Sequence, residues 1–421
     1  MIVPEESYAR PARPSDPSWL APRADPARTH AQPARGLTIE LVQDRQGFEA
    51  LKPEWDRLHK KASTIRRLPF QSHAWLSHWC ETHLRHGASG QVRLAIAVVR
   101  QGSAVCLICP FAVERVYGLK RLVWMGDPAS QYGDVLLNHD RASSTEIAAA
   151  FHHVLDHVAP DIIRLRRVRA DAAAAPFLRG EKAAIAATNH APSIDLTKTP
   201  TPDAYAARFS AKARKNRRRL RRRLEEKGTV SVTVIPAGPR AREALATALA
   251  FKQEWLVKRG EICSALRAPH TQTLLQQAVS AEDHGFAPYV SVMSCGDEPV
   301  SVQFGIVSGN RLALHLIAYN PAWEEAGVGI LHTEETINDA IEKGFLELDF
   351  LGPDASYKRI WSDDAVAIND YVLAPTMSGK LFAETFFGRS RMRFKYVLEH
   401  LPRTVRRRIA RRLDHRAGQD A

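Results

Sequence analysis

The stretch that decides the fold reads LALHLIAYNPAWEEAGVGILHTEETINDAIEKGFLELDFLGPDASYKRIW and occupies residues 312–361. In it, an apolar strand pattern leads into a Gly-x-Gly turn at Gly327 and Gly329, and a helix pattern and a second strand follow. A helix that begins at such a turn directs unpaired backbone N–H groups and the positive end of its dipole at an anion. The stretch predicts a unit that binds phosphate where the helix begins, next to an open strand edge.

The same order of elements occurs in each half of the chain. Residues 92–116 contain two strand patterns joined by a turn, and residues 289–308 contain another such pair. Each pair is followed by a further strand, a loop, a helix and a last strand. This duplication predicts an α/β (α+β) protein of two tandem domains, each with a mixed, mainly antiparallel sheet flanked by helices.

The domain boundaries follow from changes in composition. Residues 1–36 hold seven prolines without an apolar period, so we expect a disordered Pro/Ala/Arg-rich tail. The N-terminal domain is predicted over 37–197, a basic connecting helix over 198–230 and the C-terminal domain over 231–375. A basic amphipathic helix is expected over 376–421.

Composition excludes several classes of protein. No apolar run reaches the roughly 18 residues of a membrane-spanning helix, and the first forty residues lack a signal-peptide stretch, so we expect a cytoplasmic protein. The odd number of cysteines argues against a disulfide framework. Cys106 and Cys109 lie in an apolar strand pattern and are expected to be buried thiols; no metal site is predicted. The five cysteines are Cys80, Cys106, Cys109, Cys263 and Cys295.

Two segments carry the formal net charge of +13. Residues 212–227 hold ten Lys or Arg against two Glu, and residues 389–416 hold eleven against two acids. The first is predicted to be a helix with Leu220 and Leu224 on one face. A solvated helix is the default expectation; the alternatives are a clamp for a phosphorylated or lipid-diphosphate acceptor, a tRNA contact and a membrane-surface patch. The second contains an amphipathic pattern over 392–413, which we expect to dock on the protein itself, with an anionic bilayer as the alternative.

Three stretches carry a resemblance to a known family. They are PFQSHAWLSHW at 69–79, SAKARKNRRRLRRRLEEKG at 210–228, and the block at 312–361. From about residue 71 to residue 361 the chain resembles the Fem-like branch of the Gcn5-related (GNAT) acyltransferases. Within it, the chain looks most like the CelD/BcsL acetyltransferases associated with cellulose and exopolysaccharide biosynthesis. The resemblance implies two tandem acyltransferase folds, of which the C-terminal one binds the acyl donor.

The donor implied by the resemblance is acetyl-CoA or another acyl-CoA. The family's pyrophosphate motif, Gln/Arg-x-x-Gly-x-Gly/Ala, matches residues 324–329, with acidic Glu324 at its first position. The phosphates are expected at Gly327 and Gly329 and at the backbone amides of Ile330 and Leu331. Two neighbouring glutamates would repel a pyrophosphate unless they point away or the amides dominate.

Acyl transfer needs a base for the acceptor, a donor for the carbonyl oxygen and an acid for the leaving thiolate. His315, in the middle of a strand, is the candidate base, and Asp349 could orient or replace it. Tyr319 is the candidate acid. Lys358 could offer a cation to an acyl oxygen, a diphosphate or an acidic sugar. The alternatives are a structural histidine, a packing tyrosine and a surface lysine.

Four further residues are candidates for binding the acceptor. Tyr357 and Trp361 flank Lys358 in a pattern that matches the family, and Tyr132 and Asp134 fall where relatives show a similar pair, although they could simply end a strand. The favoured function is direct acyl transfer from acyl-CoA to a sugar or envelope-polysaccharide precursor, at the inner face of the membrane. The alternatives are Fem-like transfer from aminoacyl-tRNA and a non-catalytic protein that binds nucleic acid or membrane.

Overall fold

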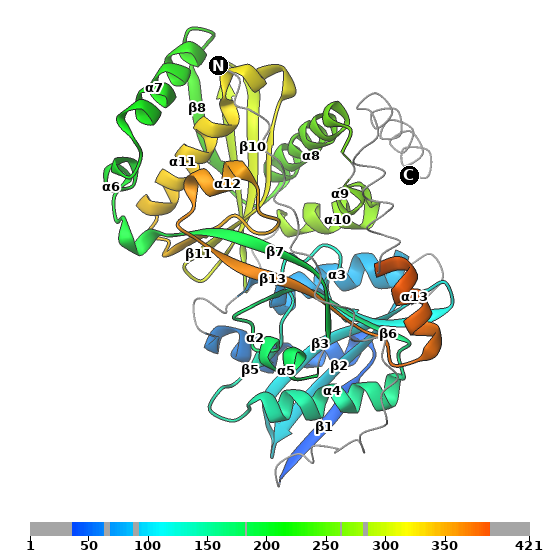
Figure 1. Cartoon of the computed structure of the whole chain (residues 1–421). Coiled ribbons are helices and arrows are strands. Elements are labelled where there is room, and N and C mark those ends of the chain that lie inside the picture. Colours follow the sequence, from blue (N-terminus) through cyan, green and yellow to red (C-terminus); the bar gives the residue numbers. More distant parts are fainter. Residues whose placement is uncertain are drawn as a thin grey trace. The chain divides into compact units, whose positions relative to one another are not determined.

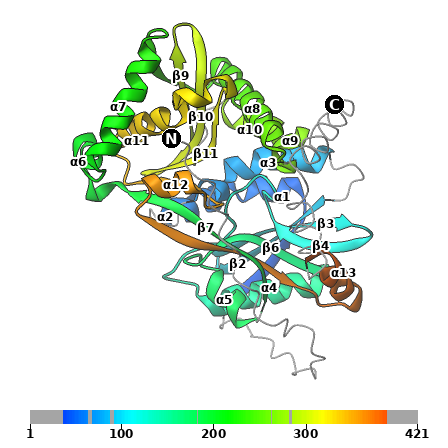
Figure 2. The same cartoon turned by 45° about the horizontal axis from the view of Figure 1, so that its top comes forward.

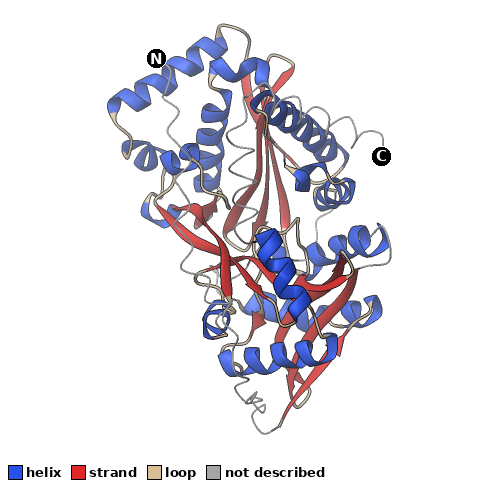
Figure 3. Ribbon diagram, turned by 45° about the vertical axis from the view of Figure 1, so that its right-hand side comes forward, coloured by secondary structure: helices blue, strands red, loops and turns tan. Residues whose placement is uncertain are grey.

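The computed structural model describes residues 36–62, 68–86, 92–181, 183–261, 263–280 and 285–387. Within these ranges the chain forms two compact units in which helices flank sheets (Figures 1 and 3). Among the described residues, the first unit comprises 36–62, 92–181, 183–192 and 352–387, and the second comprises 68–86, 193–261, 263–280 and 285–351. Residues 1–35 of the tail predicted over 1–36, and the amphipathic pattern at 392–413, lie outside the described residues.

Unit 1 is built on a sheet with the strand order β1-β2-β3-β4-β6-β13-β7. Strands β1 to β4 pair antiparallel in turn, β13 pairs antiparallel with β6, and only β4 and β6 are seen to run parallel. The predicted turn between the paired strands is confirmed, because Gly102 has a φ of 59° between them. The strands are β1 (Leu37–Val42), β2 (Val92–Gln101), β3 (Ala104–Val116), β4 (Leu119–Trp124), β5 (Leu136–Leu137), β6 (Ile162–Arg169), β7 (Ala184–Asp195) and β13 (Asp364–Leu373).

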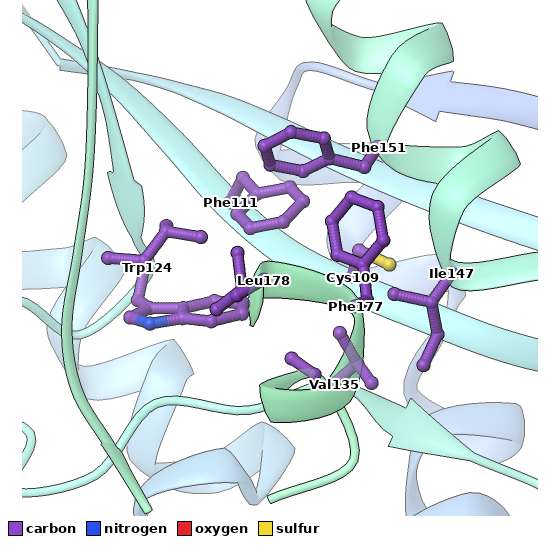
Figure 4. A pocket seen from close by; sticks show the side chains of 10 residues that line it. Cys109, Phe111, Trp124, Val135, Ile147, Phe151, Phe177 and Leu178 are labelled. Atoms are coloured by element: carbon purple, nitrogen blue, oxygen red, sulfur yellow. The ribbon is translucent and has the colours of Figure 1, made fainter. Parts of the chain in front are cut away.

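Helix α4 closes the core of unit 1. Its first residue follows Ser143, which forms a capping box with Glu146 and fixes where the helix begins. Phe151 points from the helix onto Phe111 of β3, with the ring centroids 5.9 Å apart, and both lie beside a small apolar cavity (Figure 4). Cys106 and Cys109 are buried thiols on β3, as the sequence predicts. The helices of this unit are α1 (Arg45–Ala50), α2 (Lys52–Lys61), α4 (Ser144–Val158), α5 (Ala175–Gly180), α12 (Ser356–Trp361) and α13 (Met377–Phe387).

Unit 2 has the strand order β12-β11-β10-β9-β8, and residues 193–195 at the end of β7 pair with β12. Strands β11 and β12 run parallel, as expected for strands joined through a helix, and the other neighbours are antiparallel. Figure 1 shows these strands between α11 and α8. The strands are β8 (Val230–Ile235), β9 (Ala287–Cys295), β10 (Glu298–Ser308), β11 (Arg311–Tyr319) and β12 (Glu347–Asp349).

The helices of unit 2 include one from an unexpected part of the chain. Helix α3 packs on α10 of this unit, although the sequence places it within a predicted N-terminal domain of residues 37–197. The exchange is reciprocal, since β13 follows unit 2 along the chain but completes the sheet of unit 1. The helical segments are η2 (Pro69–Gln71), α3 (His73–His86), η3 (Leu196–Lys198), α6 (Pro202–Ala207), α7 (Ala211–Glu225), α8 (Pro239–Arg259), α9 (Ser264–Arg267), α10 (Pro269–Ala278), η4 (Pro321–Ala326) and α11 (Val328–Glu342).

The basic helix α7 lies beside α11 in Figures 1 and 2. Leu224 is fully buried in a cluster with Val328 and Leu331, as the predicted apolar face requires. Arg217 is also buried, and its Nε donates to Glu334 of α11 at 2.6 Å. Part of the positive charge of α7 is therefore used inside the unit. The exposed cations of the helix are Lys212, Lys215, Arg218, Arg219, Arg222 and Arg223.

Replacing Phe151 by alanine should destabilise unit 1, because it leaves a cavity where a fully buried ring packs. We expect the free energy of unfolding, measured with denaturant, to fall by about 3–5 kcal/mol. Thr145→Ala, at an exposed position of the same helix, is the matched control and should change it by no more than about 0.5 kcal/mol. Equal effects of the two substitutions would contradict the packing described for α4.

Candidate functional site

The turn between β11 and α11 has the geometry of an anion site. Gly327 has a φ of 69°, in the left-handed region that favours glycine, and it ends η4 and begins α11. The N–H groups of Ile330 and Leu331 donate to the carbonyl of Gly327 at 3.0 and 3.1 Å, so they are used within the turn. Among the described residues, the N–H groups of Val328 and Gly329 form no hydrogen bond. These two amides are the donors available to an anion, and Val328 is one that the sequence did not indicate.

Close packing requires both glycines of the turn. A Cβ atom on Gly329 would lie 3.1 Å from Cδ1 of Tyr319, and one on Gly327 would lie 2.9 Å from Cδ1 of Leu220. The start of α11 is thus held between the last residue of β11 and helix α7. Side chains at either position would displace the backbone that offers the free amides.

One edge of β11 is open next to this turn. Strand β12 pairs with β11 over only three residues, from Arg311 opposite Glu347 to Ala313 opposite Asp349. Beyond Ala313, the only strand that pairs with β11 within the described residues is β10. The backbone of residues 314–319 therefore offers N–H and C=O groups on the side that faces away from β10, as the sequence predicts.

His315 sits at a β-bulge on this strand. Phe304 pairs with Leu316 and Gly305 pairs with Leu314, so His315 is the extra residue between the two pairs. Bulges of this kind redirect a side chain and are frequent next to active sites. Rings surround the half-buried imidazole: the centroids of Phe70, Trp75 and Phe304 lie 6.0, 6.1 and 5.7 Å from its own. The predicted role of His315 as a base stays a prediction.

Asp349 holds the end of β12. The residue is fully buried, its Oδ1 accepts the N–H of Leu351 at 2.7 Å, and its Oδ2 lies 3.7 Å from Nη1 of Arg311. Nε of the same arginine donates to Glu347 at 2.9 Å. These contacts hold the start of β11 and the end of β12 together, so the carboxylate of Asp349 has a structural role. Its catalytic role stays a prediction.

Tyr319 closes the strand and begins a chain of hydrogen bonds. The indole N–H of Trp255 donates to its hydroxyl at 2.7 Å, and the hydroxyl donates to Glu324 at 3.3 Å. Burial raises the pKa of Tyr319, so the phenol keeps its proton at neutral pH. A protonated phenol is what a general acid requires, and here its proton is directed at Glu324.

Glu324, the acidic residue at the first position of the phosphate motif, is paired. Its carboxylate lies 3.0 Å from Nζ of Lys258 and 3.4 Å from Nη2 of Arg259. Burial alone would raise the pKa of Glu324, but hydrogen bonds and the charges of these two cations outweigh it and hold the pKa below its usual value. The negative charge expected to repel a phosphate is therefore offset by two positive charges.

A buried histidine anchors α11 to the sheet. Ser301 Oγ donates its only hydrogen to the carbonyl of Ala318 at 3.0 Å, so it accepts from Nδ1–H of His332 at 2.8 Å. Nε2 of His332 then accepts the hydroxyl of Ser291 at 2.9 Å. The imidazole and both hydroxyls are fully buried, and burial lowers the pKa of His332 to about 3. This neutral chain links β9, β10, α11 and the end of β11; its serines lie 41 and 31 residues before the histidine.

The remaining candidate residues belong to unit 1. Tyr132 is buried, with the guanidinium of Arg169 5.2 Å from its ring centre. The carboxylate of Asp134 accepts the N–H groups of Ala173 and Ala174 at 2.8 and 2.9 Å, which fixes the loop before α5.

Helix α12 carries the other three candidates. Lys358 is buried and its Nζ donates to the carbonyl of Pro353 at 2.9 Å, so it is not a surface lysine. Trp361 is buried, while Tyr357 is 42% exposed. Of these three side chains, Tyr357 is the one that solvent reaches most freely.

Comparison with known proteins identifies part of the chain. Residues 211–359, which include the turn, the open edge and His315, match the family described as Acetyltransferase (GNAT) domain. This stretch is similar to a GNAT acetyltransferase domain. Such a domain is found in acyltransferases. Of the two other stretches that carry the resemblance, 210–228 lies at the beginning of the matched residues and 69–79 lies before them. No curated protein matches this sequence.

Several solved structures are similar to this chain over most of its length. FemX is similar with a TM-score of 0.53 at 10% sequence identity, over 80% of this chain and 98% of that one. The L-PGS from Bacillus licheniformis has a TM-score of 0.47 at 14% identity, over 76% and 96% of the two chains. A tandem GNAT protein from the clavulanic acid biosynthesis pathway has a TM-score of 0.47 at 12% identity, over 80% and 98%. The FemX likeness shows the fold alone. In the part of the chain that the structure describes, no helix is both long and apolar enough to cross a membrane.

The buried neutral His332 makes stability depend on pH in a defined direction. Its pKa falls from 6.5 to about 3 on folding, so between these values the unfolded chain binds a proton that the folded chain does not. The contribution of the neutral His332 to the free energy of unfolding is fully present above about pH 6.5. It is lost as the pH falls from there towards the folded-state pKa of about 3, by up to about 1.4 kcal/mol per pH unit. We expect the unfolding free energy of the parent to have a steeper slope than that of His332→Gln between pH 5 and 6.5. Parallel slopes in denaturant titrations would contradict the buried neutral imidazole.

Proposed function

We propose that the protein is an acyltransferase that uses acetyl-CoA or another acyl-CoA and modifies an N or O atom of a sugar or envelope-polysaccharide precursor. The observation that carries this proposal is the pair of free amides at Val328 and Gly329 beside the open edge of β11. The amides and the helix dipole suit a pyrophosphate. The open edge suits an extended carrier arm, which can add main-chain hydrogen bonds to an unpaired strand.

The chemistry proposed is direct transfer from donor to acceptor. His315 takes a proton from the acceptor, Tyr319 gives one to the leaving thiolate, and Asp349 positions β11 through Arg311. Burial raises the pKa values of Cys106 and Cys109, so these thiols stay protonated and are poor nucleophiles. Direct transfer therefore agrees with the state of these two cysteines.

The acceptor is proposed from the resemblance to the CelD/BcsL acetyltransferases. Tyr357, exposed on α12, is the proposed contact for a sugar, with Lys358 and Trp361 supporting it from buried positions. Tyr132 and Asp134, which belong to unit 1 as α12 does, are further proposed residues for binding the acceptor. We propose that the enzyme works at the inner face of a membrane, with the basic segments drawing it to anionic lipid.

A second candidate is Fem-like transfer from aminoacyl-tRNA. The exposed cations of α7 favour it, because a row of arginines that is not used inside the fold attracts a phosphate polymer. Arg217 and Arg221 do not belong to this row, since they pair with Glu334 and Glu335 of α11.

Gly329→Glu should abolish the binding of acetyl-CoA. The new side chain meets the ring of Tyr319 and brings a negative charge to the free amides. Calorimetry should show heat for the parent and none for the variant, with thermal unfolding as the check on folding. Gly180→Glu introduces the same charge into open space in unit 1 and should bind like the parent. No heat from the parent at millimolar acetyl-CoA would overturn the acyl-CoA proposal.

Arginine substitutions on α7 separate the two donors. If acyl-CoA is the donor, Arg218→Ala combined with Arg222→Ala should change acetyl-CoA affinity less than about twofold, because surface charges at a distance are largely screened. The tRNA candidate instead predicts weaker RNA binding and a smaller salt dependence in filter-binding titrations. Arg240→Ala with Arg242→Ala, on the exposed start of α8, is the control. RNA-dependent transfer lost only in the α7 variant would favour the second candidate.

A further inference from the structure

Two cations at the end of α8 hold an anion next to the Gly-x-Gly turn. Nζ of Lys258 lies 3.0 Å from one carboxylate oxygen of Glu324, and Nη2 of Arg259 lies 3.4 Å from the other. The hydroxyl of Tyr319 donates to the second oxygen at 3.3 Å. The two cations thus already form a receptor for an oxyanion, and a carboxylate of the chain itself occupies it.

The receptor groups are held in place by Trp255. Its indole N–H donates to the hydroxyl of Tyr319 at 2.7 Å, and the guanidinium of Arg259 lies 4.4 Å from its ring centre. With these two contacts, Trp255 holds the phenol of Tyr319 and the guanidinium of Arg259 close to the carboxylate of Glu324. Because Tyr319 also packs on Gly329, the receptor and the free amides share one wall.

The carboxylate in this receptor is replaceable. The side chains of Lys258 and Arg259 are 52% and 51% exposed, and that of Glu324 is 35% exposed. Ion pairs so open to water contribute little and exchange readily. A phosphate carries more charge and more acceptor oxygens than a carboxylate, so it makes stronger charge-assisted hydrogen bonds to the same cations.

We propose that Lys258 and Arg259 form a phosphate subsite beside the free amides and that Glu324 competes with the phosphate for it. The identity of the phosphate, a diphosphate or phosphate ester of an acyl carrier, rests on the proposed function. Glu324 then selects among anionic ligands: a weakly charged ligand leaves its carboxylate on the two cations, and a multiply charged phosphate displaces it. The acidic first position of the motif lowers the affinity for phosphate without removing the site.

The test measures inorganic pyrophosphate and acetyl-CoA binding by calorimetry at low salt. Glu324→Gln should bind both ligands about three- to tenfold more tightly than the parent, because it frees two exposed ion-pair partners. Glu325→Gln removes the same charge from the neighbouring exposed residue and should change affinity less than about twofold. In a Lys258→Gln/Arg259→Gln background, the gain from Glu324→Gln should disappear.

Each outcome decides between the subsite and the donor. Equal gains from the two glutamate substitutions, or a gain that persists without the two cations, would overturn the subsite. If all variants bind acetyl-CoA equally, the phosphate subsite is overturned, while the proposal that acyl-CoA is the donor stands. Pyrophosphate that follows the expected order, with acetyl-CoA bound by none, would keep the subsite and overturn the donor. No pyrophosphate binding by any variant would overturn the subsite as well.

Discussion

The placement of α11 on its sheet is the constraint on which the candidate site depends. His332 lies one turn into the helix and hydrogen-bonds to serine hydroxyls on two strands. This row of hydrogen bonds ends at the carbonyl of Ala318, the residue before Tyr319. Each polar atom has a partner, which is what makes a fully buried imidazole tolerable. These hydrogen bonds fix the start of α11 relative to the end of β11, and so fix the direction of the free amides of Val328 and Gly329.

Much of the second unit could be predicted from local patterns. The strand, turn, helix and strand between residues 312 and 361 follow from apolar period and from glycine, because both act over a few residues. The face of α7 that carries Leu220 and Leu224 was predictable for the same reason. Backbone geometry confirms the turn, since Gly327 is left-handed and both glycines are closely packed.

What could not be predicted depends on contacts between distant parts of the chain. Nothing in the helix pattern marks His332, since its serine partners are set by the pairing of β9 with β10. The exchange of α3 and β13 between units has no local signal either, because an amphipathic helix fits any apolar face of suitable size. Val328 was missed because counting free amides requires knowing which ones the turn itself uses. The pairing of Glu324 with α8 likewise depends on a helix more than sixty residues away.

The charges around the turn offset the acidic first position of the motif. A helix start contributes about half a positive charge, which two unpaired carboxylates would outweigh. Glu324 is paired with Lys258 and Arg259, so its group of three carries a net positive charge. Glu325 is exposed, and water and salt screen an exposed charge within about 10 Å. In this group α8 supplies two positive charges against the one negative charge of Glu324, which leaves one surplus cation near the free amides.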